Sequence, residues 1–186
     1  MAASTSTVPP VWRQQGRVRD WFHTKAGAKF LNLQTAWFRI AAPKGYAVLT
    51  TVGRRTGTPR RSNVRAIVRG DRAFVVSIAG RANDWFHNLH AKPEASLRIG
   101  RRDWIGRARQ PRDDGERHAA RAAYCETVNW FDRISSLVNQ QGIPSRQRIR
   151  AMHTRWIDEG ELFVIELIGA ECSATPSSLN RGRSQG

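Results

Sequence analysis

The sequence predicts a single α+β domain in which about six mostly antiparallel strands form a barrel or sheet with flanking helices. Short β-branched segments are separated by tight turns at Gly53, Gly70 and Gly100, as is typical of antiparallel structure. Helical patterns are inserted at particular points and do not follow every strand, which argues against a doubly wound parallel sheet. With 186 residues, 40% of them hydrophobic, the chain fits one domain with one packed core.

Both ends of the chain are expected to lie outside that core. Residues 1–19 mix Ser, Thr, Pro, Gln and Arg with little apolar periodicity, so we expect a flexible N-terminal arm. Residues 20–171 are expected to form the folded domain, and residues 172–186 a disordered C-terminal tail. Aromatic residues recur at a helical spacing over residues 26–40, which predicts an amphipathic helix near the start of the domain.

Six segments have the composition and pattern of β-strands. They are residues 46–52, 61–69, 73–79, 95–99, 104–109 and 162–168. In the second segment two sets of residues alternate, Val64, Ala66 and Val68 on one face and Arg65, Ile67 and Arg69 on the other. That alternation predicts that one face of this strand is exposed to solvent or bound to a ligand.

The other periodic segments predict helices. A short helix is expected between Asn83, which can cap its start, and Pro93, where it must stop. Residues 113–158 predict two or three more helices. Asp113 suits the start of the first of them, and Ser145 can cap the last.

The charge of the chain predicts an anionic partner. The formal net charge is +16 and is carried mostly by arginine, whose planar fork pairs bidentately with phosphate or carboxylate. No apolar run approaches the roughly 18 residues that span a bilayer, and the first residues lack a signal-peptide pattern, so we expect a cytoplasmic protein. Cys125 and Cys172 lack CxxC spacing and are expected to be reduced thiols.

A glycine-bracketed turn that carries arginines directly follows the first predicted strand. Gly53 and Gly57 permit close approach of the backbone, so N–H groups can converge on an anion while Arg54, Arg55 and Arg60 supply charge. The glycine spacing matches neither the P-loop nor the dinucleotide fingerprint. The turn therefore predicts a phosphate site of another kind, with an ordinary solvated hairpin as the alternative.

The order of these parts resembles the deazaflavin-dependent nitroreductase family. The resemblance covers residues 46–109 and depends on the Thr-Thr-Val-Gly-Arg-Arg-Thr-Gly turn and on the stretch that begins Gly-Arg-Ala-Asn-Asp-Trp-Phe at residue 80. It implies a split β-barrel that binds coenzyme F-420 (8-hydroxy-5-deazaflavin), a flavin analogue with a phosphate and a glutamate tail. The implied reaction is hydride transfer from the reduced cofactor to a small electron-poor acceptor, such as a quinone or a nitro compound.

The resemblance also implies which residues bind the cofactor. They are Gly53, Arg54, Arg55, Thr56, Gly57 and Arg60 for the phosphate and tail, and Ser77, Gly80 and Arg81 beside the cofactor. Trp85, Asn88 and Leu89 would form a structural clamp. Two departures concern the pocket. Asn63, Val64 and Arg65 stand where the family often has a proline and then an aromatic residue, and Arg81 would have to replace a lysine that the family often shows.

Several alternatives stay open. FMN, in a flavoprotein of the same barrel type, would use the same turn for its phosphate. A non-catalytic nucleic-acid-binding module fits the charge, but Trp85 and Phe86 have the spacing of core residues, so nucleic acid is not the favoured partner. Peripheral contact with an anionic membrane and a homodimer are both compatible with the sequence.

Catalytic side chains are not identified by any motif. Tyr46 and Tyr124 are the two phenols in the chain and thus the weak candidates for a proton donor or a pocket wall, with simple packing favoured for each. His87 and His90 lie three residues apart without a third ligand at a suitable distance, so no metal site is predicted.

Overall fold

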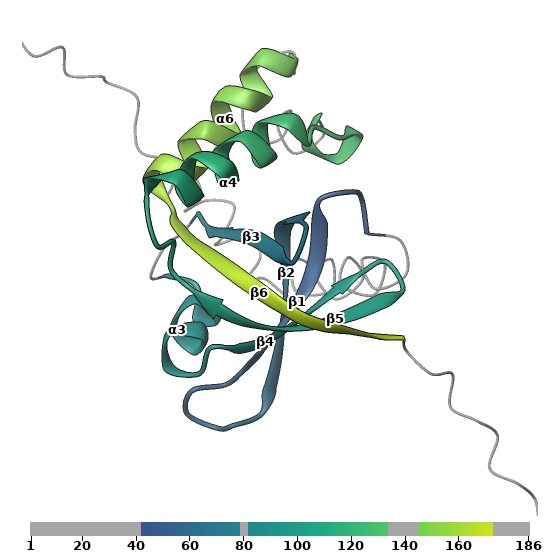
Figure 1. Cartoon of the computed structure of the whole chain (residues 1–186), viewed down its shortest axis with the longest axis vertical. Helices are drawn as coiled ribbons and strands as arrows, with labels where there is room; N and C mark the ends of the chain where they lie inside the picture. Colours follow the sequence, from purple (N-terminus) through teal and green to yellow (C-terminus); the bar gives the residue numbers. More distant parts are fainter. Residues whose placement is uncertain (1–41, 79–81, 134–144, 173–186) are drawn as a thin grey trace, which may run out of the picture.

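The computed structural model describes residues 42–78, 82–133 and 145–172, and its strands close into one barrel. The strands are β1 (Tyr46–Val52), β2 (Pro59–Arg69), β3 (Arg72–Ser77), β4 (Glu94–Ile99), β5 (Arg102–Arg109) and β6 (Glu161–Cys172). Their order around the barrel is β1, β2, β3, β6, β5, β4, and each neighbouring pair is antiparallel (Figure 1). The predicted α+β fold with six antiparallel strands is confirmed.

The last strand, β6, is longer than the sequence predicts because it has two neighbours in succession. Its first half, from Glu161 to Glu166, pairs with β3, and the part from Val164 to Cys172 pairs with β5. The two strands of the second pair approach closely at a bulge beside Gly106. A Cβ atom on Gly106 would lie 2.5 Å from the carbonyl oxygen of Glu166, so only glycine fits at this point of the barrel.

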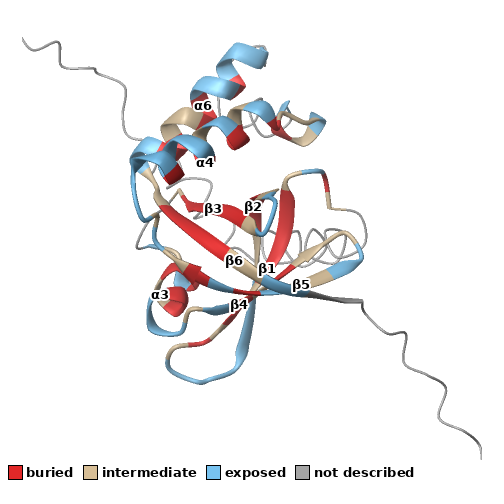
Figure 2. Ribbon diagram, viewed as in Figure 1, coloured by how far each residue is buried: buried red, intermediate tan, exposed pale blue. Residues whose placement is uncertain are grey.

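The interior of the barrel is filled by apolar side chains. They include Ala47, Leu49, Val64, Ala66, Ala73, Val75, Leu97, Ala108, Phe163 and Ile165. The short helix α3 (Asp84–Ala91) adds Trp85, Phe86 and Leu89 to the same cluster, as its spacing predicts (Figure 2). Helix α3 is therefore packed directly against the barrel core.

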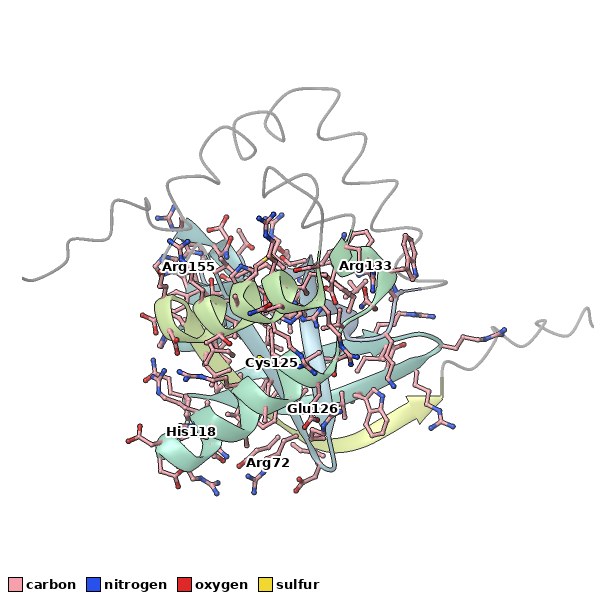
Figure 3. All side chains as sticks on the ribbon, turned by 90° about the horizontal axis from the view of Figure 1, so that it is seen from above. Arg72, His118, Cys125, Glu126, Arg133 and Arg155 are labelled. Atoms are coloured by element: carbon pink, nitrogen blue, oxygen red, sulfur yellow. The ribbon has the colours of Figure 1, made fainter. Side chains whose placement is uncertain are left out.

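Two longer helices, α4 (Asp114–Glu126) and α6 (Arg146–Glu159), lie side by side outside the barrel over β2 and β3 (Figure 1). A second apolar cluster fills the space between them and the strands, with Ile67, Phe74 and Val76 on the barrel side. Figure 3 shows the helices from above with Cys125 between them, and its sulfur lies 3.4 Å from Thr154 Oγ1. Cys125 is a free thiol.

The predicted cap of α6 is confirmed, and Asp113, which was expected at the start of a helix, caps α4. The carboxylate of Asp113 accepts a hydrogen bond from the Glu116 backbone N–H at 2.8 Å, and the hydroxyl of Ser145 accepts one from the backbone of Arg148 at 3.2 Å. The side chain of Asn83 does not cap α3, although Asn83 occupies the N-cap position, because its amide donates to Ser77 Oγ at 2.8 Å.

One prediction about β2 is wrong. Arg65 was expected on a face open to solvent or to a ligand, but only 4% of its side chain is exposed. The helices α4 and α6, which follow β5 in the chain, cover this face, and Ile67 on the same face is buried with Arg65. Two-residue alternation shows which side chains share a face and not what covers it.

Some predictions concern residues outside the described ranges. These are the N-terminal arm, the helix over residues 26–40 and the tail 172–186, except that its first residue, Cys172, is the last residue of β6. Among the helices that the structure does describe, none has the length and apolar character to cross a bilayer.

Candidate functional site

Two neighbouring pockets share Trp85 and are lined by successive residues of β2. The basic pocket, of about 430 Å³, is lined by Gly53, Arg54, Arg55, Thr56, Arg60, Arg61, Ser62, Asp84, Trp85 and Asn88. The aromatic pocket, of about 210 Å³, is lined by Asn63, Val64, Arg65, Val76, Ile78, Asn83, Trp85, Tyr124 and Trp156. A ligand with an anionic end and a flat ring could therefore occupy both.

The basic pocket is built on the turn between β1 and β2. The N–H of Gly53 donates to the carbonyl of Thr58 at 2.9 Å, and the N–H of Gly57 donates back to the carbonyl of Gly53 at 2.8 Å. Gly57 has a φ of +68°, which disfavours any residue with a Cβ. A Cβ on Gly53 would lie 3.0 Å from Thr56 Oγ1 and 3.1 Å from the Thr58 carbonyl oxygen. Both glycines are thus required for this compact turn.

Helix α3 holds the turn in place through Asn88, which is 2% exposed. The side-chain oxygen of Asn88 accepts from the backbone N–H of Arg54 at 3.1 Å, and its nitrogen donates to Thr51 Oγ1 at 3.1 Å. The guanidinium of Arg54 also pairs with Asp84 at 3.0 Å. Asn88 therefore holds the turn against α3, and part of the hydrogen-bonding capacity of Arg54 is taken up by α3.

The other arginines of the basic pocket are available to a ligand. Arg55, Arg60 and Arg61 are exposed, and no carboxylate in the described part of the chain lies within 4.0 Å of their guanidinium groups. Guanidinium groups beside a glycine turn are donors that suit phosphate and carboxylate. Sequence reasoning missed Arg61, because strand alternation alone would point it away from Arg60.

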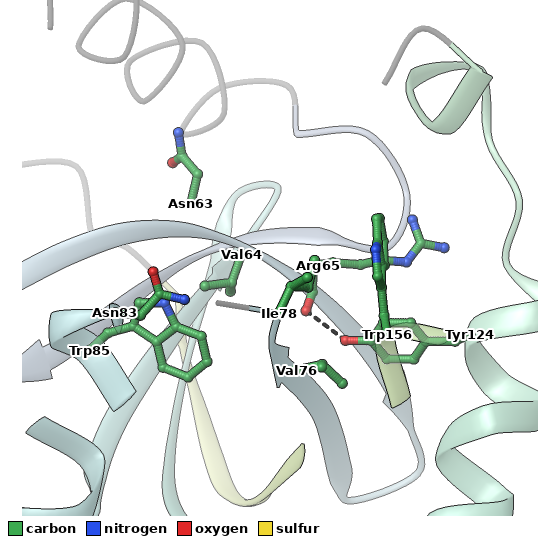
Figure 4. A pocket seen from close by; sticks show the side chains of 9 residues that line it. All are labelled: Asn63, Val64, Arg65, Val76, Ile78, Asn83, Trp85, Tyr124 and Trp156. Atoms are coloured by element: carbon green, nitrogen blue, oxygen red, sulfur yellow. Dashed lines mark hydrogen bonds between the residues drawn. The ribbon is translucent and has the colours of Figure 1, made fainter. Parts of the chain in front are cut away.

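The aromatic pocket is lined by groups from β2, the end of β3, the start of α3, α4 and α6 (Figure 4). Asn83 and Trp85 stand on one side, Tyr124 and Trp156 on the other, and Val64 and Val76 lie between them. Such walls suit a flat, uncharged ring. Sequence reasoning missed Trp156 at this site, because its helical spacing marks it only as a buried residue of α6.

The hydroxyl of Tyr124 is fully buried and occupied by backbone acceptors. It donates to the carbonyls of Arg65 and Phe74 at 3.0 and 3.3 Å. Burial raises the pKa of Tyr124 well above its usual value. In this arrangement Tyr124 acts as a pocket wall and not as an acid near neutral pH.

The other weak candidate, Tyr46, lines neither pocket. Its hydroxyl donates to Asp132 Oδ1 at 2.9 Å, beside the guanidinium of Arg65. Burial, followed by the charge of Asp132, raises the pKa of Tyr46 well above its usual value. Tyr46 therefore belongs to a buried polar cluster beneath the helices.

Of the three cofactor positions expected at the end of β3 and after it, the structure describes Ser77, which lines neither pocket. Ser77 is completely buried behind Asn83, and Gly80 and Arg81 lie outside the described residues. Within the ranges that the structure describes, no three potential metal ligands come together. His90 packs its ring against Phe86 and Phe163.

Comparison with known proteins points to one family. The family model described as F420H(2)-dependent quinone reductase matches residues 34–144, more than half of the chain. F420H(2)-dependent quinone reductases from two strains of Mycobacterium tuberculosis are each 27% identical over 95 residues, which is 45% of this chain and 64% of theirs. The chain thus spans less than two thirds of the length of these relatives. A solved F420-H2 dependent reductase (FDR-A) has a TM-score of 0.44 and 16% identity, over 66% of this chain and 95% of its own.

Proposed function

The chain belongs to the F420H(2)-dependent quinone reductase family, and we propose that it transfers a hydride from reduced coenzyme F-420 to a quinone or a similar electron-poor acceptor. The observation that carries this proposal is the pair of pockets that share Trp85, one basic and one aromatic. The family match includes every residue that lines them except Trp156.

The residues of the basic pocket fit the anionic part of the cofactor. Arg55, Arg60 and Arg61 would bind the phosphate and the glutamate tail, with Arg54 held close by Asn88. The Gly53–Gly57 turn, which includes Thr56, would bring backbone N–H groups near the same anions. Ser77 would support the pocket edge through Asn83, and Gly80 and Arg81 stay cofactor contacts on the strength of the resemblance.

The aromatic pocket would hold the ring. The bound cofactor supplies the hydride chemistry, while the protein supplies orientation and excludes water. Trp85, Val64 and Val76 would lie against the ring and hold it in one orientation towards the acceptor. Among the described residues that line this pocket, none is an acid poised near neutral pH, so we propose that solvent delivers the proton that completes reduction.

Nucleic acid is the alternative anionic partner, but the burial of two aromatic residues argues against it. Phe86 is 5% exposed and packs in the barrel core, and Trp85, 8% exposed, lines the two pockets, so neither lies on an open surface along which successive bases could stack. A homodimer, peripheral contact with an anionic membrane and a cytoplasmic location stay predictions from the sequence.

A titration of the purified protein tests the proposal. The visible absorbance of F-420 should shift on binding, and a quinone should oxidise the reduced cofactor faster with protein than without it. FMN and single-stranded DNA are the comparison ligands. DNA binding that depends on several phosphates should fall by roughly 10³–10⁵ between about 50 and 200 mM salt, whereas ring burial should preserve F-420 binding.

Three results would contradict the proposal. Tighter binding of FMN than of F-420 would favour the flavin alternative. DNA binding that survives the higher salt, without reduction of any quinone or nitro acceptor, would favour the nucleic-acid module. No spectral change with F-420 and no acceleration of quinone reduction would remove the redox assignment altogether.

A further inference from the structure

Arg65 connects the aromatic pocket to the helices outside the barrel. Asn63, Val64 and Arg65 run along one side of the pocket, and the guanidinium of Arg65 points away from it, past Trp156 (Figure 4). Only 4% of this side chain is exposed, and Asp132, its ion-pair partner, is completely buried. A charge placed so deeply beside a pocket needs a reason, because desolvation of an ion pair is costly.

The guanidinium is held from several directions. It donates one hydrogen bond to Asp132 Oδ1 and another to the carbonyl of Thr127. Its central carbon lies 5.3 Å from the ring centroids of both Tyr46 and Tyr124. Only a planar fork can meet both acceptors while it lies between two rings, so lysine cannot replace it.

The carboxylate that receives this charge is itself fixed. Tyr46 donates to Asp132 Oδ1 at 2.9 Å, and the N–H of Asn129 donates to Asp132 Oδ2 at 2.9 Å. The side chain of Arg65 is therefore tied to the segment that follows α4.

The main chain of the same residue is tied to α4. The carbonyl of Arg65 accepts the 3.0 Å hydrogen bond from Tyr124, shown dashed in Figure 4. Tyr124 lines the aromatic pocket, and α4 packs on α6, which carries Trp156. One residue of β2 thus fixes the position of the pocket wall that the helices provide.

We propose that Arg65 is a positioning residue that sets the width of the aromatic pocket by locking Tyr124 and Trp156 against the barrel. The inference rests on the proposed function, because the occupant of that pocket is the deazaflavin ring. It gives a role to a position at which the chain departs from the family pattern, since Arg65 acts from behind the pocket and does not touch the acceptor.

A second arginine that joins α4 to the barrel provides a matched control. Arg109 of β5 donates to both carboxylate oxygens of Glu116 at 2.7 Å and to Glu166 at 2.8 Å. These bonds tie the first turn of α4 to β5 and β6, and none of the three residues lines either pocket. Loss of this anchor should weaken the attachment of α4 without changing the aromatic pocket.

The experiment compares Arg65→Lys with Arg109→Lys. The probe is 8-hydroxy-5-deazariboflavin, which has the ring of the cofactor but neither phosphate nor glutamates. We expect Arg65→Lys to weaken its binding by about tenfold or more, because the fork geometry is lost, and Arg109→Lys to change it by less than about twofold. The two variants should differ by the same amount in their free energy of binding to complete F-420, because the basic pocket is intact in both.

A second readout does not need the cofactor. Hydrogen exchange of residues 120–128 and of the Trp156 indole in the free protein should be faster in Arg65→Lys than in Arg109→Lys at matched global stability. If the unmodified protein binds no deazaflavin, the proposed function is wrong. Hydrogen exchange would still test whether Arg65 holds Tyr124 and Trp156 in place. Equal exchange and equal ring affinity in the two variants would overturn the inference.

A double variant covers the case in which Arg65→Lys does not fold. Arg65→Met with Asp132→Leu replaces the buried ion pair by apolar groups of similar size, a change that commonly preserves stability. The double variant should still bind the ring about tenfold more weakly, because Thr127 loses the hydrogen bond that ties it to β2 and Tyr46 of β1 loses its bond to position 132. Ring affinity equal to that of the unmodified protein would contradict a positioning role.

Discussion

The side-chain oxygen of Asn88 lies 3.1 Å from the backbone nitrogen of Arg54 and accepts its hydrogen bond, across 34 positions of sequence. The nitrogen of the same amide donates to Thr51 Oγ1. One buried side chain of α3 therefore joins the end of β1 to the start of the basic turn. The arrangement of arginines in the pocket depends on this contact as well as on the turn's own glycines.

Asn88→Ala should loosen the turn. The substitution leaves the N–H of Arg54 without its acceptor and the Thr51 hydroxyl without its donor, which should lower the free energy of unfolding by about 1–3 kcal/mol. Urea denaturation measures that loss. Binding of F-420 should weaken while binding of 8-hydroxy-5-deazariboflavin changes little. An equal loss for both ligands would show that Asn88 does not act on the tail site.

Removal of single charges in the basic pocket tests which arginines bind the tail. Arg55→Ala and Arg60→Ala should each weaken F-420 binding by about 1.5–3 kcal/mol for every charge-assisted hydrogen bond lost. The dependence of affinity on salt should also become shallower. Arg101→Ala is the control, because Arg101 is exposed in the turn between β4 and β5 and lines neither pocket. Equal effects at all three positions would point to general charge attraction.

The basic turn and helix α3 could be predicted from the sequence because their signals are local. Glycines bracket the turn, and Trp85, Phe86 and Leu89 fall on one side of the helix within a few residues. The aromatic pocket could not be assembled in this way. Its far wall comes from Tyr124 on α4 and Trp156 on α6, and both helices follow β2 in the chain only after three more strands and α3.

Local sequence patterns also failed to predict the burial of Arg65. A strand in which arginine alternates with small apolar residues has the pattern of a half-exposed strand. Its partner, Asp132, lies 67 positions away and carries no motif that would link the two. Long-range pairing of this kind depends on the packing of α4 and α6, which local patterns do not encode.

Barrel closure should be sensitive at Gly106. A Cβ added there would lie 2.5 Å from the Glu166 carbonyl oxygen and 2.8 Å from Ile165 Cγ2, so β5 and β6 must move apart in Gly106→Ala. Overpacking of this kind should cost about 1–3 kcal/mol. Gly169→Ala, in the same pair of strands, is the control because a Cβ there meets nothing within 4 Å. Thermal melting should separate the two variants, and identical midpoints would show that the bulge can relax.

The last prediction concerns stability at mildly acidic pH and the buried His153. This side chain is completely buried, and within the described residues neither ring nitrogen has a hydrogen-bond partner. Its Nε2 lies 3.8 Å from Asp132 Oδ1, and the guanidinium of Arg65 pairs with the same carboxylate. Burial lowers the pKa of His153 below its usual value of 6.5, despite the opposing influence of Asp132.

The sign of the effect follows from proton binding in the two states. From about pH 6.5 downward the unfolded chain binds more protons at this histidine than the folded protein, so the free energy of unfolding should fall as pH falls, by at most about 1.4 kcal/mol per pH unit. His153→Phe keeps a ring of similar size and should remove the dependence that begins below about pH 6.5. Glu116 acts in a separate range, because its hydrogen bond from Arg109 lowers its pKa to about 2 and its contribution is lost only as pH falls from 4.5 towards that value. Urea denaturation at several pH values distinguishes the two groups. An unchanged slope above pH 5 in His153→Phe would assign the acid sensitivity to a group other than His153.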